Sequence, residues 1–295
     1  MNVPDALRPG DRVAVVAPAS PFPRAPFLAG LAWVAQRYRP KLREDVFARE
    51  GFLAGDDGRR ADELARAMLD PDVRAVLVAR GGYGITRIAS RLPWKDFARA
   101  PKWIVGFSDV TALHVHAAAG GVACLHAPNV TGLGASKNVH LARNRGAWLA
   151  ALERPQAPRA WTGLRAIRAG DAHGPLFGGN LALLCAMAAA GKLRVPDGAV
   201  VLLEDVTERP YRVDRMLTSL LDGGHFARAS AVVFGEFAQC DPGADGVAVD
   251  AVLAERAASL GVPVWAGAPF GHGERNEAFT LGASAVLGGG TLRWG

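Results

Sequence analysis

The chain has 295 residues, 50% of them hydrophobic and 21% charged, which is typical of a soluble globular protein and is long enough for two domains. Its net charge of +6 comes from arginines that are scattered rather than clustered with aromatic residues, which argues against a nucleic-acid partner; Arg59, Arg60 and Arg66 are expected on a solvated helix face. No apolar run reaches the roughly 18 residues of a membrane span and no secretory signal pattern is present, so we expect a cytoplasmic protein without a membrane partner.

The first half of the sequence alternates strand and helix patterns. Residues 12–18 form an almost continuous apolar run, as in a strand that is buried on both faces. The patterns that follow predict a helix at 27–36, a strand at 45–48, a helix at 59–69 with Asp57 as its cap, a strand from 73 into the glycine loop 81–84, a helix at 86–92, a strand at 103–107 and a helix from 110 to about 119. This alternation predicts an α/β domain with a parallel sheet.

The second half has a different organisation. A stretch rich in Arg, Pro and Ala leads into a glycine turn and an apolar helix, and strand-like runs follow at 199–203, 231–237, 262–265 and 284–287. We therefore predict an N-terminal α/β domain over residues 1–135, a linker over 136–165, and a smaller C-terminal barrel-like α/β domain over 166–295.

Three segments of the first half follow predicted strands and are expected on one rim of the sheet. They are Pro18–Ser20, Arg80–Gly84 and Gly106–Asp109, and ligands of parallel α/β sheets bind outside the carboxyl ends of the strands. The glycine loop lacks the spaced Gly-x-Gly-x-x-Gly pattern of dinucleotide-binding proteins. It is either a simple turn or a segment that brings a backbone N–H close to a substrate as an oxyanion donor.

Ser108 lies between a predicted strand and a predicted helix, and two interpretations apply to it, which are compatible with each other. Serine is a preferred helix cap. A strand-to-helix turn is also where a nucleophile elbow exposes a serine hydroxyl, although the Gly-x-Ser-x-Gly pattern of that elbow is missing here.

An acid and a histidine follow Ser108 in the second half. Glu204 and Asp205 end a buried apolar run, and either could orient a histidine, while His272 lies between two glycines after another strand pattern. The order serine, acid, histidine is that of α/β-hydrolases. His114 and His116 point to different faces of their predicted helix, and the three cysteines show no zinc-like spacing, so neither a metal nor a cofactor is expected.

Six stretches together resemble the serine LD-carboxypeptidase family, whose best-known members are muramoyltetrapeptide carboxypeptidases. They are GDRVAVVAPASP, ARGGYG, GFSDVTAL, GPLFGGNLALL, LLEDVTERPYRVDRML and PFGHGERN, and they run through nearly the whole chain in the family's order. The resemblance implies a catalytic Ser108, Glu204 and His272. It also implies a flavodoxin-like N-terminal domain, a barrel-like C-terminal domain, an active site between them and a homodimer.

The expected reaction is removal of the terminal D-alanine from a murein tetrapeptide during cell-wall recycling. The backbone N–H groups of Gly82 and Asp109 are the expected oxyanion donors. Arg80, Gly81 and Arg275 lie beside the expected site and are candidates for binding the substrate carboxylate.

Two alternatives remain at this stage. One is the branch of the same family that hydrolyses microcin-type aminoacyl nucleotides and confers self-immunity; the compact length, without an obvious inserted loop, favours the murein enzyme. The other is a non-catalytic nucleotide- or sugar-binding module, which would need neither Ser108 nor His272.

Overall fold

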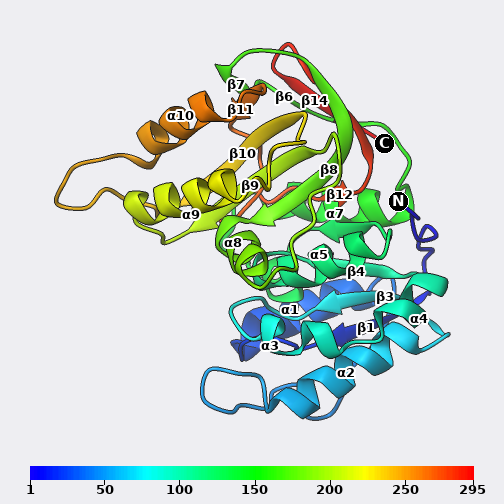
Figure 1. The fold of residues 1–295 in the computed structure, drawn as a ribbon. Helices are drawn as coiled ribbons and strands as arrows, with labels where there is room; N and C mark the ends of the chain where they lie inside the picture. Colours follow the sequence, from blue (N-terminus) through cyan, green and yellow to red (C-terminus); the bar gives the residue numbers. More distant parts are fainter. The chain divides into compact units, whose positions relative to one another are not determined.

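The computed structural model describes residues 1–295 and divides into two compact units. The first unit contains Met1–Pro155 and Glu277–Thr280, and the second contains Gln156–Asn276 and Leu281–Gly295. Figure 1 shows the first unit in blue to green and most of the second in green to red. None of the helices combines the length and the apolar character that crossing a bilayer requires.

The first unit is built on a six-stranded sheet in the order β12-β5-β4-β3-β1-β2. Its strands are β1 (Arg12–Val16), β2 (Arg39–Lys41), β3 (Val73–Val78), β4 (Trp103–Gly106), β5 (Cys124–His126) and β12 (Phe279–Leu281). Strands β1 to β5 pair in parallel, and their order 2-1-3-4-5 is that of the flavodoxin-like doubly wound fold. The expected fold of the N-terminal half is therefore confirmed.

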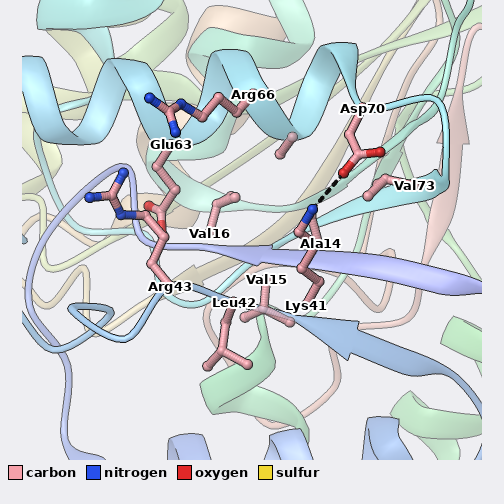
Figure 2. Close-up of a pocket in the computed structure, with 11 residues that line it drawn as sticks. Ala14, Val15, Val16, Lys41, Leu42, Arg43, Glu63, Arg66, Asp70 and Val73 are labelled. Atoms are coloured by element: carbon pink, nitrogen blue, oxygen red, sulfur yellow. Dashed lines mark hydrogen bonds and ion pairs between the residues drawn. The ribbon is translucent and has the colours of Figure 1, made fainter.

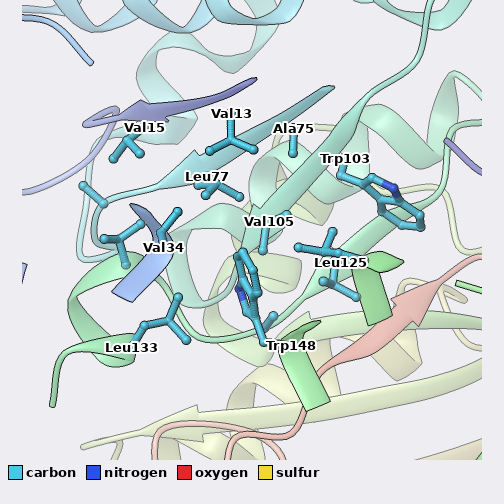
Figure 3. Packing of buried hydrophobic residues seen from close by; sticks show 14 of the residues in the cluster. Val13, Val15, Val34, Ala75, Leu77, Trp103, Val105, Leu125, Leu133 and Trp148 are labelled. Atoms are coloured by element: carbon cyan, nitrogen blue, oxygen red, sulfur yellow. The ribbon is translucent and has the colours of Figure 1, made fainter. Parts of the chain in front are cut away.

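Helices connect these strands on both faces of the sheet. They are α1 (Arg24–Ala35), α2 (Asp57–Leu69), α3 (Ile85–Ile88), α4 (Trp94–Arg99), α5 (Thr111–Ala119), α6 (Val130–Leu133) and α7 (Leu141–Glu153), with 3₁₀ turns η1 (Ala89–Arg91) and η2 (Ser108–Val110). Alternate strand residues such as Val13, Leu77 and Val105 pack with Val34 of α1 and Trp148 of α7 (Figure 3). The residues between them, such as Val16, Val76 and Ile104, are also fully buried. Strands covered on both faces have to be apolar at every position, which explains the continuous runs in the sequence.

Two local predictions for this unit are wrong. Residues 45–48 form turns instead of a strand, because Ala48 N–H donates to Asp45 O at 2.8 Å, and the edge strand is the earlier β2. A run of four residues with strand-like composition is too short to distinguish a strand from a turn.

The cap of α2 is Asp56, whose carboxylate accepts from Arg59 N–H at 2.7 Å. Asp57 is instead the first residue of the helix and pairs with Arg87 at 2.9 Å.

The expectation that the arginines of α2 are solvated holds for Arg66 but is wrong for its two neighbours. The side chain of Arg66 is 77% exposed, whereas those of Arg59 and Arg60 are 8% and 0% exposed. Arg60 donates to the carbonyls of Pro18 at 2.6 Å and Gly84 at 2.8 Å, which follow β1 and β3. Burial of the guanidinium is tolerated because its N–H groups donate to these carbonyl groups at the rim of the sheet, one of which, Gly84 O, also accepts from Arg87 N–H at 3.3 Å.

The second unit contains an eight-stranded sheet in the order β6-β14-β13-β8-β9-β10-β11-β7. Its strands are β6 (Arg159–Thr162), β7 (Arg165–Arg168), β8 (Ala172–Asn180), β9 (Val200–Val206), β10 (Ala231–Ala238), β11 (Val264–Ala266), β13 (Ser284–Gly288) and β14 (Thr291–Trp294), with helices α8 (Leu181–Ala189), α9 (Pro210–Asp222) and α10 (Val249–Ser259). Strands β8 to β11 are parallel, and antiparallel pairs flank them on both sides. This curled sheet confirms the barrel-like α/β expectation for the C-terminal half.

The predicted glycine turn before α8 is a strand, β8. Gly178 within it has φ +136°, and a Cβ added there would lie 1.9 Å from the carbonyl oxygen of Leu202 on β9. Glycine therefore serves here to let two backbones approach each other, which the sequence pattern alone does not separate from a turn.

The predicted linker, residues 136–165, is shared by the two units. Trp148 and Leu152 of α7 lie in the core of the first unit, while β6 pairs with β14 in the second, and the division falls after Pro155. Burial of a tryptophan fixes α7 to the first unit, because removing so large an apolar side chain from water is strongly favourable. Residues 277–280 return to the first unit, which the sequence did not indicate.

Candidate active site

Ser108 lies at the turn between β4 and α5 in a left-handed backbone conformation, with φ +65°. Positive φ is uncommon outside glycine and costs on the order of 1–3 kcal/mol, so surrounding contacts have to enforce it. The cap positions of η2 and α5 are Phe107 and Val110, and neither helix has a side-chain cap hydrogen bond. The cap interpretation of Ser108 is therefore wrong, and the strained strand-to-helix turn is the geometry of a nucleophile elbow.

The glycine loop after β3 lies directly against this turn. A Cβ added to Gly81 would be 2.9 Å from Ser108 Cβ and 3.1 Å from Ser108 Oγ. Gly82 has φ +105°, and a Cβ there would be 2.5 Å from Ser20 Oγ. Two glycines in succession let the backbone pass between Ser108 and Ser20, so the loop can present its amide groups beside the Ser108 hydroxyl.

Asp109 joins the serine turn to the segment that follows the glycine loop. Its side chain is 1% exposed and accepts a hydrogen bond from Ile85 N–H at 2.9 Å. Burial raises the pKa of Asp109 to about 7, although that hydrogen bond and the charge of Arg60 act in the opposite direction. Ser20 and Arg60 organise the same rim. The sequence placed the Pro18–Ser20 segment there but gave no role to Ser20, and it placed Arg60 on a solvated face, because the partners of both residues are backbone groups distant along the chain.

In the second unit, the tertiary structure separates the two acids at the end of β9. The side chain of Glu204 is fully buried, and its Oε2 lies 2.7 Å from His272 Nδ1. Asp205 points to the other face of the sheet, where it accepts from Asn180 Nδ2 at 3.0 Å and from Ala182 N–H, at the start of α8, at 2.9 Å. The alternation of side chains along a strand thus gives the two neighbouring acids different partners.

His272 lies in a shaped loop after β11. Gly271 has φ +125°, and a Cβ there would be 3.1 Å from Glu204 Oε2, so glycine at this position leaves space for the carboxylate. Burial lowers the pKa of His272, but the hydrogen bond and charge of Glu204 raise it more, and the net pKa lies above the ordinary 6.5. The bond to Glu204 favours the tautomer with its proton on Nδ1, which makes Nε2 the basic nitrogen.

The two candidate arginines lie in different surroundings. Arg80 is exposed and donates to the carbonyl of Pro21 at 2.7 Å, and Arg275 is partly buried in the His272 loop.

The two histidines of α5 lie in the first unit. His114 is buried, which lowers its pKa to about 3, and His116 stacks on Trp94 with ring centroids 5.2 Å apart. Both therefore have packing roles in the first unit.

A pocket in the first unit lies between β1, α2 and the residues after β2, and none of the candidate site residues lines it (Figure 2). Its volume is about 220 Å³. Its charged groups pair with one another or with neighbours: Lys41 with Asp70 at 2.8 Å, and Arg66 with Asp62 at 2.8 Å. Because these charges are already paired, we do not expect the pocket to bind a charged ligand.

Comparison with known proteins gives consistent matches over both halves of the chain. Residues 13–127 match the LD-carboxypeptidase N-terminal domain and residues 173–287 the LD-carboxypeptidase C-terminal domain. The murein tetrapeptide carboxypeptidase of Pseudomonas aeruginosa is 35% identical, over 96% of this chain and 95% of its own length.

Solved structures agree with these matches. The muramoyltetrapeptide carboxypeptidase from Oxalobacter formigenes superposes with a TM-score of 0.85 and 26% identity, covering 96% of this chain and 97% of that one. The microcin C7 self-immunity protein MccF has a TM-score of 0.91 at 18% identity, covering 100% of this chain and 98% of that one, which is a likeness of fold.

Proposed function

The chain belongs to the LD-carboxypeptidase family, and we propose that it removes the terminal D-alanine from murein tetrapeptide by serine catalysis. The observation that carries the mechanism is the 2.7 Å bond between His272 Nδ1 and the fully buried Glu204. A histidine oriented in this way is a general base with its Nε2 available for a nucleophile. Ser108, in its strained turn, is the serine in the chain whose backbone has the conformation of an exposed nucleophile.

The proposed reaction has two steps. Ser108 Oγ attacks the carbonyl carbon between the L-centre of diaminopimelate and D-alanine, while His272 Nε2 accepts the hydroxyl proton and passes it to the leaving amine. Water then hydrolyses the acyl-enzyme, with His272 as the base again. Glu204 keeps the imidazole in one tautomer and stabilises its charged form. The proposal requires the first unit's serine and the second unit's histidine to meet in the working enzyme.

The proposed oxyanion donors are backbone amides of the first unit. Asp109 N–H follows the nucleophile at the start of a helix, where amide groups lack intrahelical acceptors, and Gly82 N–H comes from the loop that packs on Ser108. Arg80 and Arg275 are the proposed partners of the substrate carboxylate. A cytoplasmic location and a homodimer remain predictions.

The pH dependence should follow His272, because only the neutral imidazole can accept the proton. Since its pKa is raised above 6.5, kcat/KM should fall as the pH drops through that raised value. Glu204→Gln should move the apparent pKa downward, because burial then acts without the opposing carboxylate. Burial also raises the pKa of Asp109 to about 7, so NMR titration of the imidazole is needed beside the pH–rate profile to assign the acid limb. An acid limb unchanged in Glu204→Gln would contradict this assignment.

Gly81→Ala should lower kcat by about 10- to 100-fold, since displacements of about 1 Å at a reacting group have effects of that size. The added methyl group would lie 2.9 Å from Ser108 Cβ, so either the loop or the serine must move. The matched control is Gly132→Ala in α6, where a Cβ meets only an ordinary contact at 3.4 Å. Steady-state kinetics of the two variants, beside their melting curves, checks this; equal kcat values would show that the loop is not close to the chemistry.

Mass spectrometry of the products tests the proposed function. Murein tetrapeptide should lose one alanine, and the same peptide ending in L-alanine should stay intact. A parallel incubation with an aminoacyl adenylate analogue distinguishes the microcin-type activity. Cleavage of the analogue alone would assign the chain to that branch, and no cleavage of either compound would favour the non-catalytic binding module.

A further inference from the structure

Ser20 makes two hydrogen bonds to the glycine loop from the segment that follows β1. Its backbone N–H donates to the carbonyl oxygen of Gly81 at 3.3 Å. Its side-chain Oγ accepts from the backbone N–H of Tyr83 at 3.1 Å. One residue therefore holds the loop at the two positions on either side of Gly82.

These two bonds fix both peptide planes that meet at the Gly82 Cα. The carbonyl of Gly81 and the N–H of Gly82 belong to one planar, trans peptide unit and point in opposite directions. Holding that carbonyl with Ser20 N–H therefore sets the direction of the Gly82 N–H. The next peptide unit carries Tyr83 N–H, which Ser20 Oγ holds.

Without such restraints the loop would be mobile, because glycine populates many backbone conformations at little cost. Gly82 has φ +105°, and the space in front of its Cα is filled by Ser20, whose Oγ would be 2.5 Å from an added Cβ. Ser108 fills the space in front of the Gly81 Cα, because a Cβ added there would lie 3.1 Å from Ser108 Oγ. The loop thus runs between the two serines, one in contact with each glycine.

We propose that Ser20 is a positioning residue that orients the Gly82 amide toward the oxyanion formed at Ser108. The inference rests on the proposed function, because the Gly82 amide can stabilise an oxyanion only if Ser108 is the nucleophile. Ser20 acts through Gly82 and has no role in proton transfer. Preorganised donors are effective because they need no reorganisation when charge develops.

Kinetics of Ser20 variants test the proposal. Ser20→Ala keeps the backbone bond to Gly81 and removes the Oγ bond to Tyr83 N–H, which leaves the Gly82 backbone with one restraint instead of two. This variant should lower kcat by about 10-fold and leave KM within about threefold, since a less well positioned donor acts mainly on the transition state. Ser20→Thr keeps the hydroxyl and should recover most of kcat. Ser20→Cys, with similar volume and a weaker acceptor, provides a second deletion of the hydroxyl if Ser20→Ala folds poorly. The matched control is Ser90→Ala, at an exposed serine of the same unit. A normal kcat in folded Ser20→Ala would overturn the proposal.

A tetrahedral mimic separates positioning from a general structural role. In a boronic acid built on the product tripeptide, boron accepts the Ser108 oxygen, the hydroxyl proton passes to His272, and a boron-bound oxygen occupies the oxyanion position. Ser20→Ala should weaken binding of this compound by the same factor as kcat/KM, and should leave binding of the tripeptide product unchanged. Equal weakening for both compounds would show that Ser20 only maintains the fold.

The two proposals fail in different ways. If Ser108 is not the nucleophile, Ser108→Ala retains activity whatever the Ser20 variants show. If only the role of Ser20 is wrong, Ser108→Ala is inactive while Ser20→Ala turns over normally.

Discussion

Ser108→Ala is expected to reduce turnover of murein tetrapeptide by several orders of magnitude, on the order of 10⁴–10⁶ in kcat, with only a small change in melting temperature. The hydroxyl makes no cap hydrogen bond for either helix at the turn, so its loss should not destabilise them. The residual rate would come from the oxyanion donors and substrate binding. Turnover measured beside thermal melting checks both parts, and near-normal turnover by the folded variant would leave the proposed mechanism without its nucleophile.

Ser108→Gly is the matched control for backbone strain. Glycine adopts φ near +65° without steric cost, so this variant should be as inactive as Ser108→Ala but more stable than it by about 1 kcal/mol. The double variant Ser108→Ala/His272→Ala should be little worse than either single variant, because groups that act as a unit are not additive. Losses that multiply instead would show that the two residues act separately.

Glu204→Gln is expected to lower kcat by about 10³–10⁴ while the protein stays folded. The amide can donate to His272 Nδ1, which favours the tautomer that carries its proton on Nε2 and so removes the general base. The side chain is fully buried, so water cannot replace the lost carboxylate charge.

Asp205→Asn is the matched control at the next position of the same strand. Its carboxylate accepts hydrogen bonds from Asn180 and Ala182, whereas the hydrogen bond to the imidazole comes from Glu204. This change should therefore lower the unfolding free energy and reduce kcat much less than Glu204→Gln does. Burial raises the pKa of Asp205 to about 6, so the assays belong at a pH of about 8, where Asp205 is ionised in the parent enzyme. A larger loss of kcat in Asp205→Asn than in Glu204→Gln would reverse the assignment of the acid.

The fold class and the family follow from the amino-acid sequence alone. Continuous apolar runs are needed wherever helices cover both faces of a parallel sheet, so the strands at 12–16, 73–78 and 103–106 could be read directly. Six motifs in a fixed order along the chain indicated the family, which the matches over both halves confirm. These features are local in the sequence, because each depends on residues only a few positions apart.

Features that depend on residues distant along the chain became visible only in the folded protein. It distinguished Glu204 from Asp205, since that choice depends on which face of β9 the loop after β11 covers. It placed Arg60 in the interior, because the carbonyls that need its donors lie 42 and 24 residues away. It also brought Ser20 onto the glycine loop 63 residues later, where parallel strands end at one rim of the sheet. Local sequence patterns do not indicate such partners, because buried polar groups form hydrogen bonds with whichever donors and acceptors the folded chain brings close to them.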